Sequence, residues 1–191
     1  MTLQFSWYNA FWYFAVYGLV SWLVMRFMPP ETRKKVLTYA PTKSRWEKIS
    51  LTASRILRVL SYILAILSPV NIHALSFYMG TIVYIMGLIL STAALWQFSK
   101  VDVEKPITNG LYRYSRHPMQ VMFYLLCLGV LLASANLYLT LCTIGYLVTF
   151  YPSFALQESY CLEQYGDVYA AYQKQTPRLL LINKEPKGEL L

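Results

Sequence analysis

Two segments of this 191-residue chain carry side chains that could do chemistry. The first segment, residues 105–118, reads KPITNGLYRYSRHP. Its Arg116 offers two parallel donors that match a carboxylate or a phosphate, and His117 can donate or accept a proton near neutral pH. Asn109-Gly110 predicts a turn, and Pro118 suits the first turn of a helix. The segment is therefore interpreted either as a binding site or as an interfacial anchor of Arg and Tyr side chains in which the histidine is incidental.

The second segment, residues 157–172, reads QESYCLEQYGDVYAAY and is rich in acidic and aromatic side chains. Helical spacing predicts that four apolar or aromatic side chains lie near one face, namely Leu162, Tyr165, Tyr169 and Tyr172. Glu158 follows the apolar Phe154 by about one helical turn, so it is expected close to the membrane surface. A carboxylate there is costly unless it meets a cation or a hydrogen-bond donor, which favours a functional role. Glu163 and Asp167 are interpreted as ordinary surface charges.

Transmembrane helices must position these two segments. The chain is 57% hydrophobic and only 14% charged, whereas soluble domains carry nearer a quarter charged residues. A hydrocarbon core about 30 Å thick needs roughly 20 helical residues to cross it. Long apolar runs predict about five spans, over residues 8–28, 56–70, 75–98, 119–135 and 137–156. In the shortest of these, Arg55 and Arg58 are expected to extend their charges to the interface.

The charged residues fall in alternate loops. Basic residues gather after the first span, after the third span and in the C-terminal tail, whereas the loops near Asn71 and Asn136 hold no Lys, Arg, Asp or Glu. The positive-inside rule then predicts an N-terminus outside and a C-terminus in the cytoplasm, in a bacterial or archaeal inner membrane or in the endoplasmic reticulum. The net charge of +8 is accordingly interpreted as a matter of orientation and lipid contact and not of nucleic-acid binding.

The last two spans are expected to form an antiparallel hairpin, because Ser134-Ala135-Asn136 predicts a tight turn between them. Pro152 is expected to bend the fifth span near the cytoplasmic interface. The hairpin would bring both reactive segments to the same side of the membrane. The three cysteines, Cys127, Cys142 and Cys161, lack metal-ligand spacing and are interpreted as packing residues, so no metal site is predicted.

Together the two segments resemble the isoprenylcysteine carboxyl methyltransferase family and the related membrane phospholipid methyltransferases. The resemblance extends from about Lys105 to Arg178 and rests on four groups of residues: Gly110-Leu111-Tyr112, Arg116-His117-Pro118, Gln157-Glu158 with the aromatic run that follows it, and Pro177-Arg178. It implies an all-α integral membrane enzyme that uses S-adenosylmethionine, with a cytoplasmic C-terminal helical segment completing the cofactor pocket. Residues 1–104 would then form an N-terminal region of three spans, and residues 105–191 the catalytic region.

The resemblance also implies where the cofactor binds. The pocket would lie between the loop before the fourth span and the helix after the fifth. Its expected cofactor-binding residues are Gly110, Tyr112, Arg116, His117, Pro118, Gln120 and Glu158. Two of these, Arg116 and Glu158, are also expected to be catalytic. Arg116 can pair with the cofactor carboxylate and Glu158 with its ammonium, while tyrosine rings can face the adenine or the sulfonium.

Two departures from the family pattern concern the methyl acceptor and the activity. Gln120 replaces a tyrosine, and Gln157 replaces the first glutamate of a pair. The expected reaction is methyl transfer to a lipidic or apolar acceptor that enters between the spans, such as an isoprenylcysteine carboxylate, a phospholipid amine or a thiol. One alternative is an NADPH-dependent enzyme like the membrane sterol reductases, which carry a related Arg-His-Pro segment. The other is a non-catalytic membrane protein that has kept the fold.

Overall fold

The described part of the chain consists of helices joined by loops. The computed structural model describes residues 7–37, 40–100 and 105–179, and within these it contains helices and no named strand. The helices are α1 Phe11–Arg26, α2 Pro30–Leu37, α3 Arg45–Ile66, α4 Leu75–Ser99, the 3₁₀ helix η1 Gly110–Arg113, α5 Pro118–Ser134, α6 Leu137–Phe150 and α7 Pro152–Gln175. This confirms the prediction of an all-α fold.

Several of these helices suit a membrane. Within the described residues, three stretches are long and apolar enough to cross one, Arg45–Ile66, Leu75–Ser99 and Leu137–Gln175, and α1 and α5 are shorter apolar helices. The chain is therefore an all-α integral membrane protein. The bounds of α4 and α5 differ from the predicted runs 75–98 and 119–135 by no more than one residue at either end. The second predicted span, 56–70, was wrong at both ends, because α3 runs from Arg45 to Ile66.

The early start of α3 has a local cause. The Ser44 hydroxyl accepts from the Glu47 backbone N–H, and the Glu47 carboxylate accepts from the Ser44 N–H. Such a reciprocal capping box satisfies two otherwise unpaired donors at a helix N-terminus. The helix thereby includes residues 45–55, which precede the predicted apolar run. As a result α3 extends beyond that run toward the polar end of the molecule.

Glycines allow α4 and α5 to pack closely along their lengths. A Cβ atom built on Gly80 would lie 2.3 Å from the backbone nitrogen of Ala133, and one on Gly129 would lie 2.4 Å from that of Tyr84. Gly87 meets the backbone of Leu126 in the same way, at 2.6 Å. Small residues let helix backbones approach in membranes, where the hydrophobic effect gives little drive for helix association. The loop before α5 connects these two closely packed helices.

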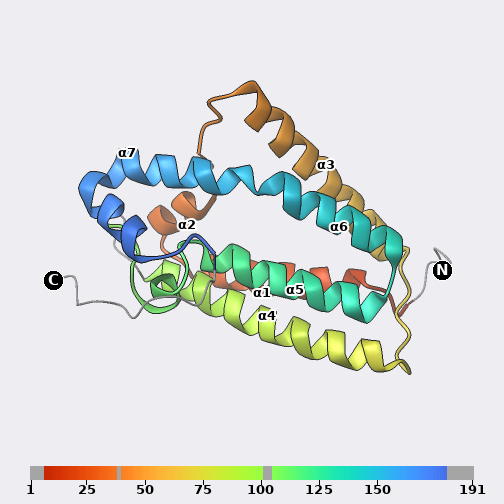
Figure 1. The fold of residues 1–191 in the computed structure, drawn as a ribbon. Helices are drawn as coiled ribbons and strands as arrows, with labels where there is room; N and C mark the ends of the chain where they lie inside the picture. The colour runs from red at the N-terminus through yellow and green to blue at the C-terminus, as the bar shows by residue number, and fades with distance from the viewer. Residues whose placement is uncertain (1–6, 38–39, 101–104, 180–191) are drawn as a thin grey trace.

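A second pair, α3 and α6, packs above the first (Figure 1). The Ser50 hydroxyl donates to the Thr149 carbonyl at 2.7 Å, and the Cys142 thiol donates to the Leu57 carbonyl at 3.3 Å. The predicted turn between α5 and α6 is present, with Ala135 in the left-handed region at φ 46°. The two helices run in opposite directions but diverge from this turn, so each has its main partner elsewhere.

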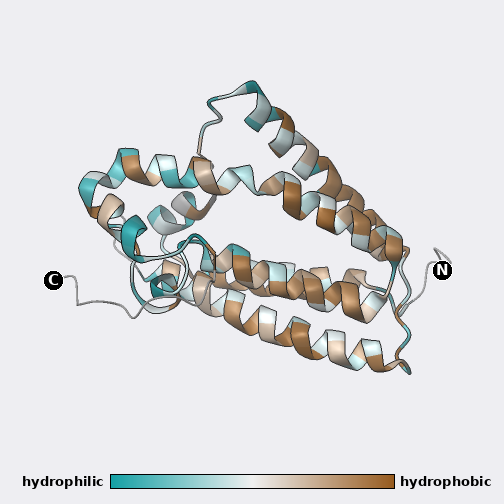
Figure 2. Cartoon of the chain, in the orientation of Figure 1, coloured by the Kyte–Doolittle hydropathy of each residue, from teal (hydrophilic) through white to brown (hydrophobic). Residues whose placement is uncertain are grey.

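The two ends of the helical assembly differ in polarity (Figure 2). The turns between α3 and α4 and between α5 and α6 lie at one end, whereas α2, η1 and the bent part of α7 lie at the other (Figure 1). Hydrophilic residues concentrate at that second end. The proposed boundary at residue 104 stays a prediction about function, because α4 on one side of it packs along α5 on the other.

Candidate active site

The loop before α5 is shaped by one glycine and one glutamine. Gly110 adopts φ +62°, a conformation that L side chains rarely adopt, at the start of η1. A Cβ atom there would lie 2.2 Å from the Gln97 side-chain nitrogen, and the Gln97 side-chain oxygen Oε1 accepts from the Leu111 N–H at 3.0 Å. Pro118 lies in the first turn of α5, where its missing N–H costs no hydrogen bond. The loop is therefore fixed to α4 on one side and to α5 on the other.

The opposing element, α7, is bent twice. Pro152 separates α6 from α7 and lies in the first turn of the new helix, so the predicted bend is a helix boundary. Gly166 then interrupts α7 with φ 54° and ψ −131°. The predicted face from Leu162 to Tyr172 rested on regular helical spacing, which this kink breaks by turning the second half of α7 back toward the loop (Figure 1). Tyr172 reaches the loop as a result. Of the four members of the predicted face, Tyr165, Tyr169 and Tyr172 nevertheless line one cleft.

The returning end of α7 is bonded to the loop at several points. The Tyr172 hydroxyl donates to the Tyr112 carbonyl at 2.6 Å. The Arg116 backbone N–H donates to the Pro177 carbonyl at 3.0 Å, and the Ser115 hydroxyl donates to the Arg178 carbonyl at 3.1 Å. Residues 112–116 and 172–178 thus close on each other although about 60 residues separate them in the chain.

Glu158 lies at the centre of this closure. Its side chain is 6% exposed, and its carboxylate accepts from Arg178 Nε at 2.9 Å and from Arg178 Nη2 at 2.7 Å. The Nε2 of His117 lies 3.1 Å from the same carboxylate, and Nη1 of Arg116 lies 3.2 Å from it. Phe154 stacks on the His117 ring at 4.8 Å between centroids. Contact with Glu158 raises the pKa of Arg178, which keeps this partner charged.

A cleft of about 600 Å³ opens beside this cluster. Its lining comes from the end of α4, the loop before α5, the start of α5, and α7: Phe98, Lys105, Pro106, Ile107, Tyr112, Arg116, His117, Met119, Gln120, Gln157, Cys161, Tyr165, Tyr169 and Tyr172. Two buried polar atoms of this lining, the Tyr112 hydroxyl and Arg116 Nε, have no hydrogen-bond partner within the described chain. Burial raises the pKa of the Tyr112 phenol, so it is a neutral donor at this site.

The structure sorts the predicted site residues into two groups. Tyr112, Arg116, His117 and Gln120 line the cleft. The other three do not line it: Gly110 shapes the loop, Pro118 begins α5, and Glu158 lies behind the lining with both oxygens engaged. The structure therefore brings Arg116, His117 and Glu158 together, while their functional roles stay predictions.

Sequence reasoning missed some members of the site. Arg178 was seen only as part of the resemblance, although it makes the two shortest contacts to Glu158. Tyr169 and Tyr172 were predicted to share a face but were not predicted to line the site. Cys161, interpreted as a packing residue, also lines the cleft. Within the described ranges, no group of three His, Cys, Asp or Glu side chains could hold a metal ion.

Comparisons with known proteins point to one family. The family profile described as phospholipid methyltransferase matches residues 75–168, from α4 to the kink of α7. The chain is also similar to the protein-S-isoprenylcysteine O-methyltransferase of Schizosaccharomyces pombe, with 33% identity over 72 residues. This match spans 37% of the chain and 30% of that relative. No solved structure matches the chain significantly. The profile includes the loop before α5 and α7 as far as its kink, and together the two matches support assignment of the chain to the isoprenylcysteine carboxyl methyltransferase and phospholipid methyltransferase family.

Proposed function

We propose that this protein is a membrane methyltransferase that binds S-adenosylmethionine in the cleft between the loop before α5 and α7. The observation that carries the proposal is the pair of unpartnered buried atoms, the Tyr112 hydroxyl and Arg116 Nε, beside a cleft walled by tyrosine rings. Buried polar atoms are normally hydrogen-bonded, and an unpaired one costs on the order of 1–3 kcal/mol. A polar ligand in the cleft would satisfy both.

The residues of the cleft fit the chemistry of this cofactor. Arg116 offers a donor to its carboxylate, and Tyr112 offers a neutral hydroxyl to a polar group. Tyr165 and Tyr169 present aromatic rings that suit the adenine or the positive sulfonium. When bound, the cofactor supplies an activated methyl group, whose transfer breaks a carbon–sulfur bond and leaves a neutral thioether. The protein mainly has to align the acceptor with that methyl group, which is worth several kcal/mol.

Glu158 is proposed to act as a positioning residue. The sequence predicted that it would contact the cofactor ammonium. Its oxygens already face Arg116, His117 and Arg178, so its evident contribution is to hold Arg116 and His117 at the edge of the cleft. Removing this carboxylate leaves the largely buried guanidinium of Arg116 without its carboxylate partner, which is destabilising. A direct catalytic role is proposed for Arg116, which is supported by its place in the cleft lining and by its unpartnered Nε.

The acceptor is proposed to be lipidic or apolar. The relative from Schizosaccharomyces pombe is named as an isoprenylcysteine O-methyltransferase, and the matching family profile is described as a phospholipid methyltransferase. In this chain the cleft meets the apolar helices at Phe98 and Met119. A carboxylate or thiolate acceptor needs alignment and little base, whereas an amine acceptor must also lose a proton. Transfer of a labelled methyl group into a lipid extract, and not into water-soluble acceptors alone, is the expected result.

Calorimetric titration of the purified protein tests the cofactor. S-adenosylhomocysteine is expected to bind, and NADPH is not. The sterol-reductase alternative predicts the opposite preference. His117→Ala and Glu158→Gln should weaken S-adenosylhomocysteine binding by on the order of tenfold or more, since each loosens the Arg116 support. A non-catalytic protein that only keeps the fold would show no binding in the wild type and no methyl transfer to any lipid fraction.

A further inference from the structure

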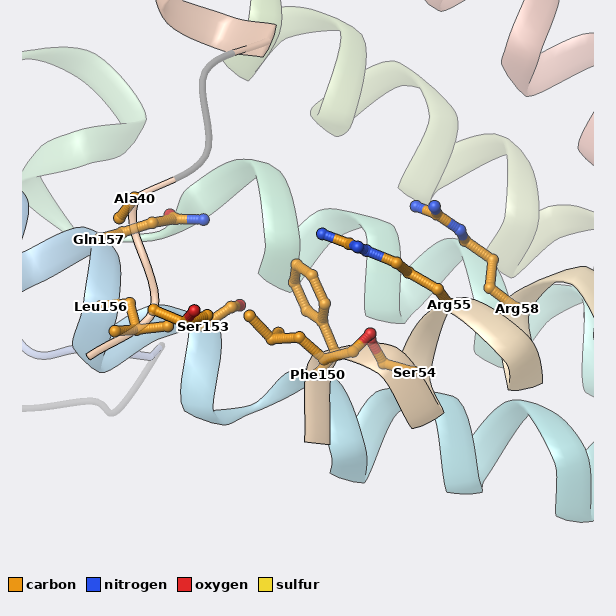
Figure 3. A pocket seen from close by; sticks show the side chains of 10 residues that line it. Ala40, Ser54, Arg55, Arg58, Phe150, Ser153, Leu156 and Gln157 are labelled. Atoms are coloured by element: carbon orange, nitrogen blue, oxygen red, sulfur yellow. The ribbon is translucent and has the colours of Figure 1, made fainter. Parts of the chain in front are cut away.

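A second pocket of about 540 Å³ lies between α3 and the start of α7 (Figure 3). It is lined by residues of the segment before α3, of α3, of the end of α6 and of α7: Ala40, Thr42, Leu51, Ser54, Arg55, Arg58, Phe150, Ser153, Leu156 and Gln157. Gln157 also lines the cofactor cleft, so one side chain borders both spaces. The two pockets are therefore neighbours across the first turns of α7.

Two arginines give this pocket its charge. Figure 3 shows the side chains of Arg55 and Arg58 extending from α3 into the pocket. Within the described residues, neither has a carboxylate within salt-bridge distance, whereas Arg116 and Arg178 share Glu158. The Glu47 carboxylate caps the start of α3, and Glu163 pairs with Lys43. The pocket therefore keeps two positive charges.

The depth of Arg58 makes its charge informative. Arg58 precedes the end of α3 at Ile66 by eight residues, or about 12 Å along the helix axis. The hydrocarbon core is about 30 Å thick, so with Ile66 at one boundary Arg58 lies well inside it. A charge at such depth is costly unless it faces a polar cavity or an opposite charge, and such residues commonly mark substrate sites. The sequence predicts that Arg55 and Arg58 extend their charges to the interface. For the identity of the ligand, it matters more that both side chains extend into the same pocket.

The remaining lining suits a ligand with one polar end. The Ser153 hydroxyl is buried and has no hydrogen-bond partner in the described chain, which adds an unsatisfied donor to the two guanidinium groups. Leu51, Phe150 and Leu156 supply apolar surface in the same pocket. Gln157 offers an amide but no negative charge, so the wall toward the cofactor cleft does not neutralise the arginines.

We infer that this pocket binds the anionic group of an amphiphile, a carboxylate or a phosphate attached to an apolar chain, through Arg55, Arg58 and Ser153. Its identification as the pocket of the methyl acceptor rests on the proposed function. If the methyl donor occupies the neighbouring cleft, only the Gln157 side chain lies between that cleft and the anionic group of the amphiphile. Arginine binds either anion through parallel donors, so carboxylate and phosphate share one chemistry here.

Spin-labelled lipids test the inference in the full chain reconstituted in phosphatidylcholine bilayers. Spin-labelled stearate and phosphatidic acid are expected to be immobilised preferentially over stearate methyl ester and diacylglycerol, their uncharged counterparts. R55Q/R58Q should lower this preference by on the order of tenfold, since it removes charge-assisted hydrogen bonds. R45Q is the matched control, because Arg45 is exposed at the polar start of the same helix and lies outside the pocket lining.

Two further variants test the inference even if R55Q/R58Q does not fold. R55K/R58K keeps both charges and should keep most of the preference. Q157E places a carboxylate in the wall and should lower it. A preference for stearate alone identifies the carboxylate source, and one for phosphatidic acid alone identifies the phosphate source. Equal immobilisation of anionic and uncharged lipids, or a preference that R55Q/R58Q and Q157E leave intact, would overturn the inference. S-adenosylhomocysteine binding by the same samples separates this outcome from failure of the proposed function.

Discussion

Glu158 organises the candidate site by serving several donors at once. Its carboxylate faces Arg116 and His117 from the loop and Arg178 from the segment after α7. The low exposure of this carboxylate means that its charge has been removed from water, which only close cations compensate. The same contacts orient Arg116 so that Nε stays available at the cleft. One buried carboxylate thus joins two segments that are distant in the sequence and helps to fix the shape of the candidate site.

Two tyrosines of the cleft separate ligand binding from stability. Tyr112→Phe removes a buried hydroxyl that has no protein partner, so we expect the ligand-free variant to be at least as stable as the wild type, with an approximately tenfold weaker affinity for S-adenosylhomocysteine. Tyr172→Phe removes a hydroxyl that donates to the Tyr112 carbonyl, so we expect a loss of about 1 kcal/mol of stability as well. Thermal unfolding and calorimetry on both variants measure the difference. A Tyr112→Phe variant with lower stability and full affinity would contradict the assignment.

Arg178 is expected to matter through its geometry as well as its charge. Arg178→Gln leaves Glu158 with two partners in place of three and loses both contacts made by the guanidinium. Because the Arg178 side chain is one-third exposed, we expect this variant to lose about 1–2 kcal/mol of folding stability, less than the loss from breaking a fully buried ion pair. Arg178→Lys should recover only part of this stability, since an ammonium group cannot donate two parallel hydrogen bonds to the Glu158 carboxylate. Arg113→Gln, on an exposed side chain of η1 in the loop before α5, is the control; an equal effect there would refute a specific role for Arg178.

Elements differed in how well the sequence predicted them. The bounds of α4 and α5 followed from uniformly apolar runs, and Asn136 caps α6 as the predicted turn required. The kink at Gly166 could not be predicted, because a glycine inside a helical pattern does not reveal the sign of its φ. Arg178 lies 20 residues beyond Glu158, so no helical spacing relates the two residues. Its role depends on the return of the chain after that kink.

The kink itself is testable. Gly166→Ala places a Cβ at φ 54° and ψ −131°, where an L residue is strained by about 1–3 kcal/mol, although nothing lies within 4 Å of the new atom. We expect a lower unfolding temperature and weaker S-adenosylhomocysteine binding, because Tyr169 and Tyr172 reach the cleft only through this bend. Gly18→Ala is the control, since Gly18 also has open space but an ordinary backbone. Similar behaviour of the two variants would show that the backbone conformation at Gly166 does not matter.

The whole molecule combines an apolar helical body with one polar end. The helix pairs α4–α5 and α3–α6 run between the two ends, and the loop before α5 and the bent part of α7 lie at the polar end (Figures 1 and 2). A water-soluble cofactor can approach such an end directly, while an amphiphile can approach from the side of the helices. The arrangement therefore gives the two proposed substrates separate routes to adjacent pockets.

The orientation of this body in the membrane is a prediction at the same scale. The basic loops lie at the polar end, so the positive-inside rule assigns that end to the cytoplasm. His73→Cys, in the exposed turn before α4, should react with a membrane-impermeant maleimide from outside intact cells. Arg113→Cys, in the exposed loop before α5, should react only after the membrane is permeabilised. Both variants carry Cys161→Ser, because Cys127 and Cys142 are buried while Cys161 is partly exposed. The reverse pattern of labelling would place the cofactor cleft on the outer face, where a cytoplasmic methyl donor could not reach it.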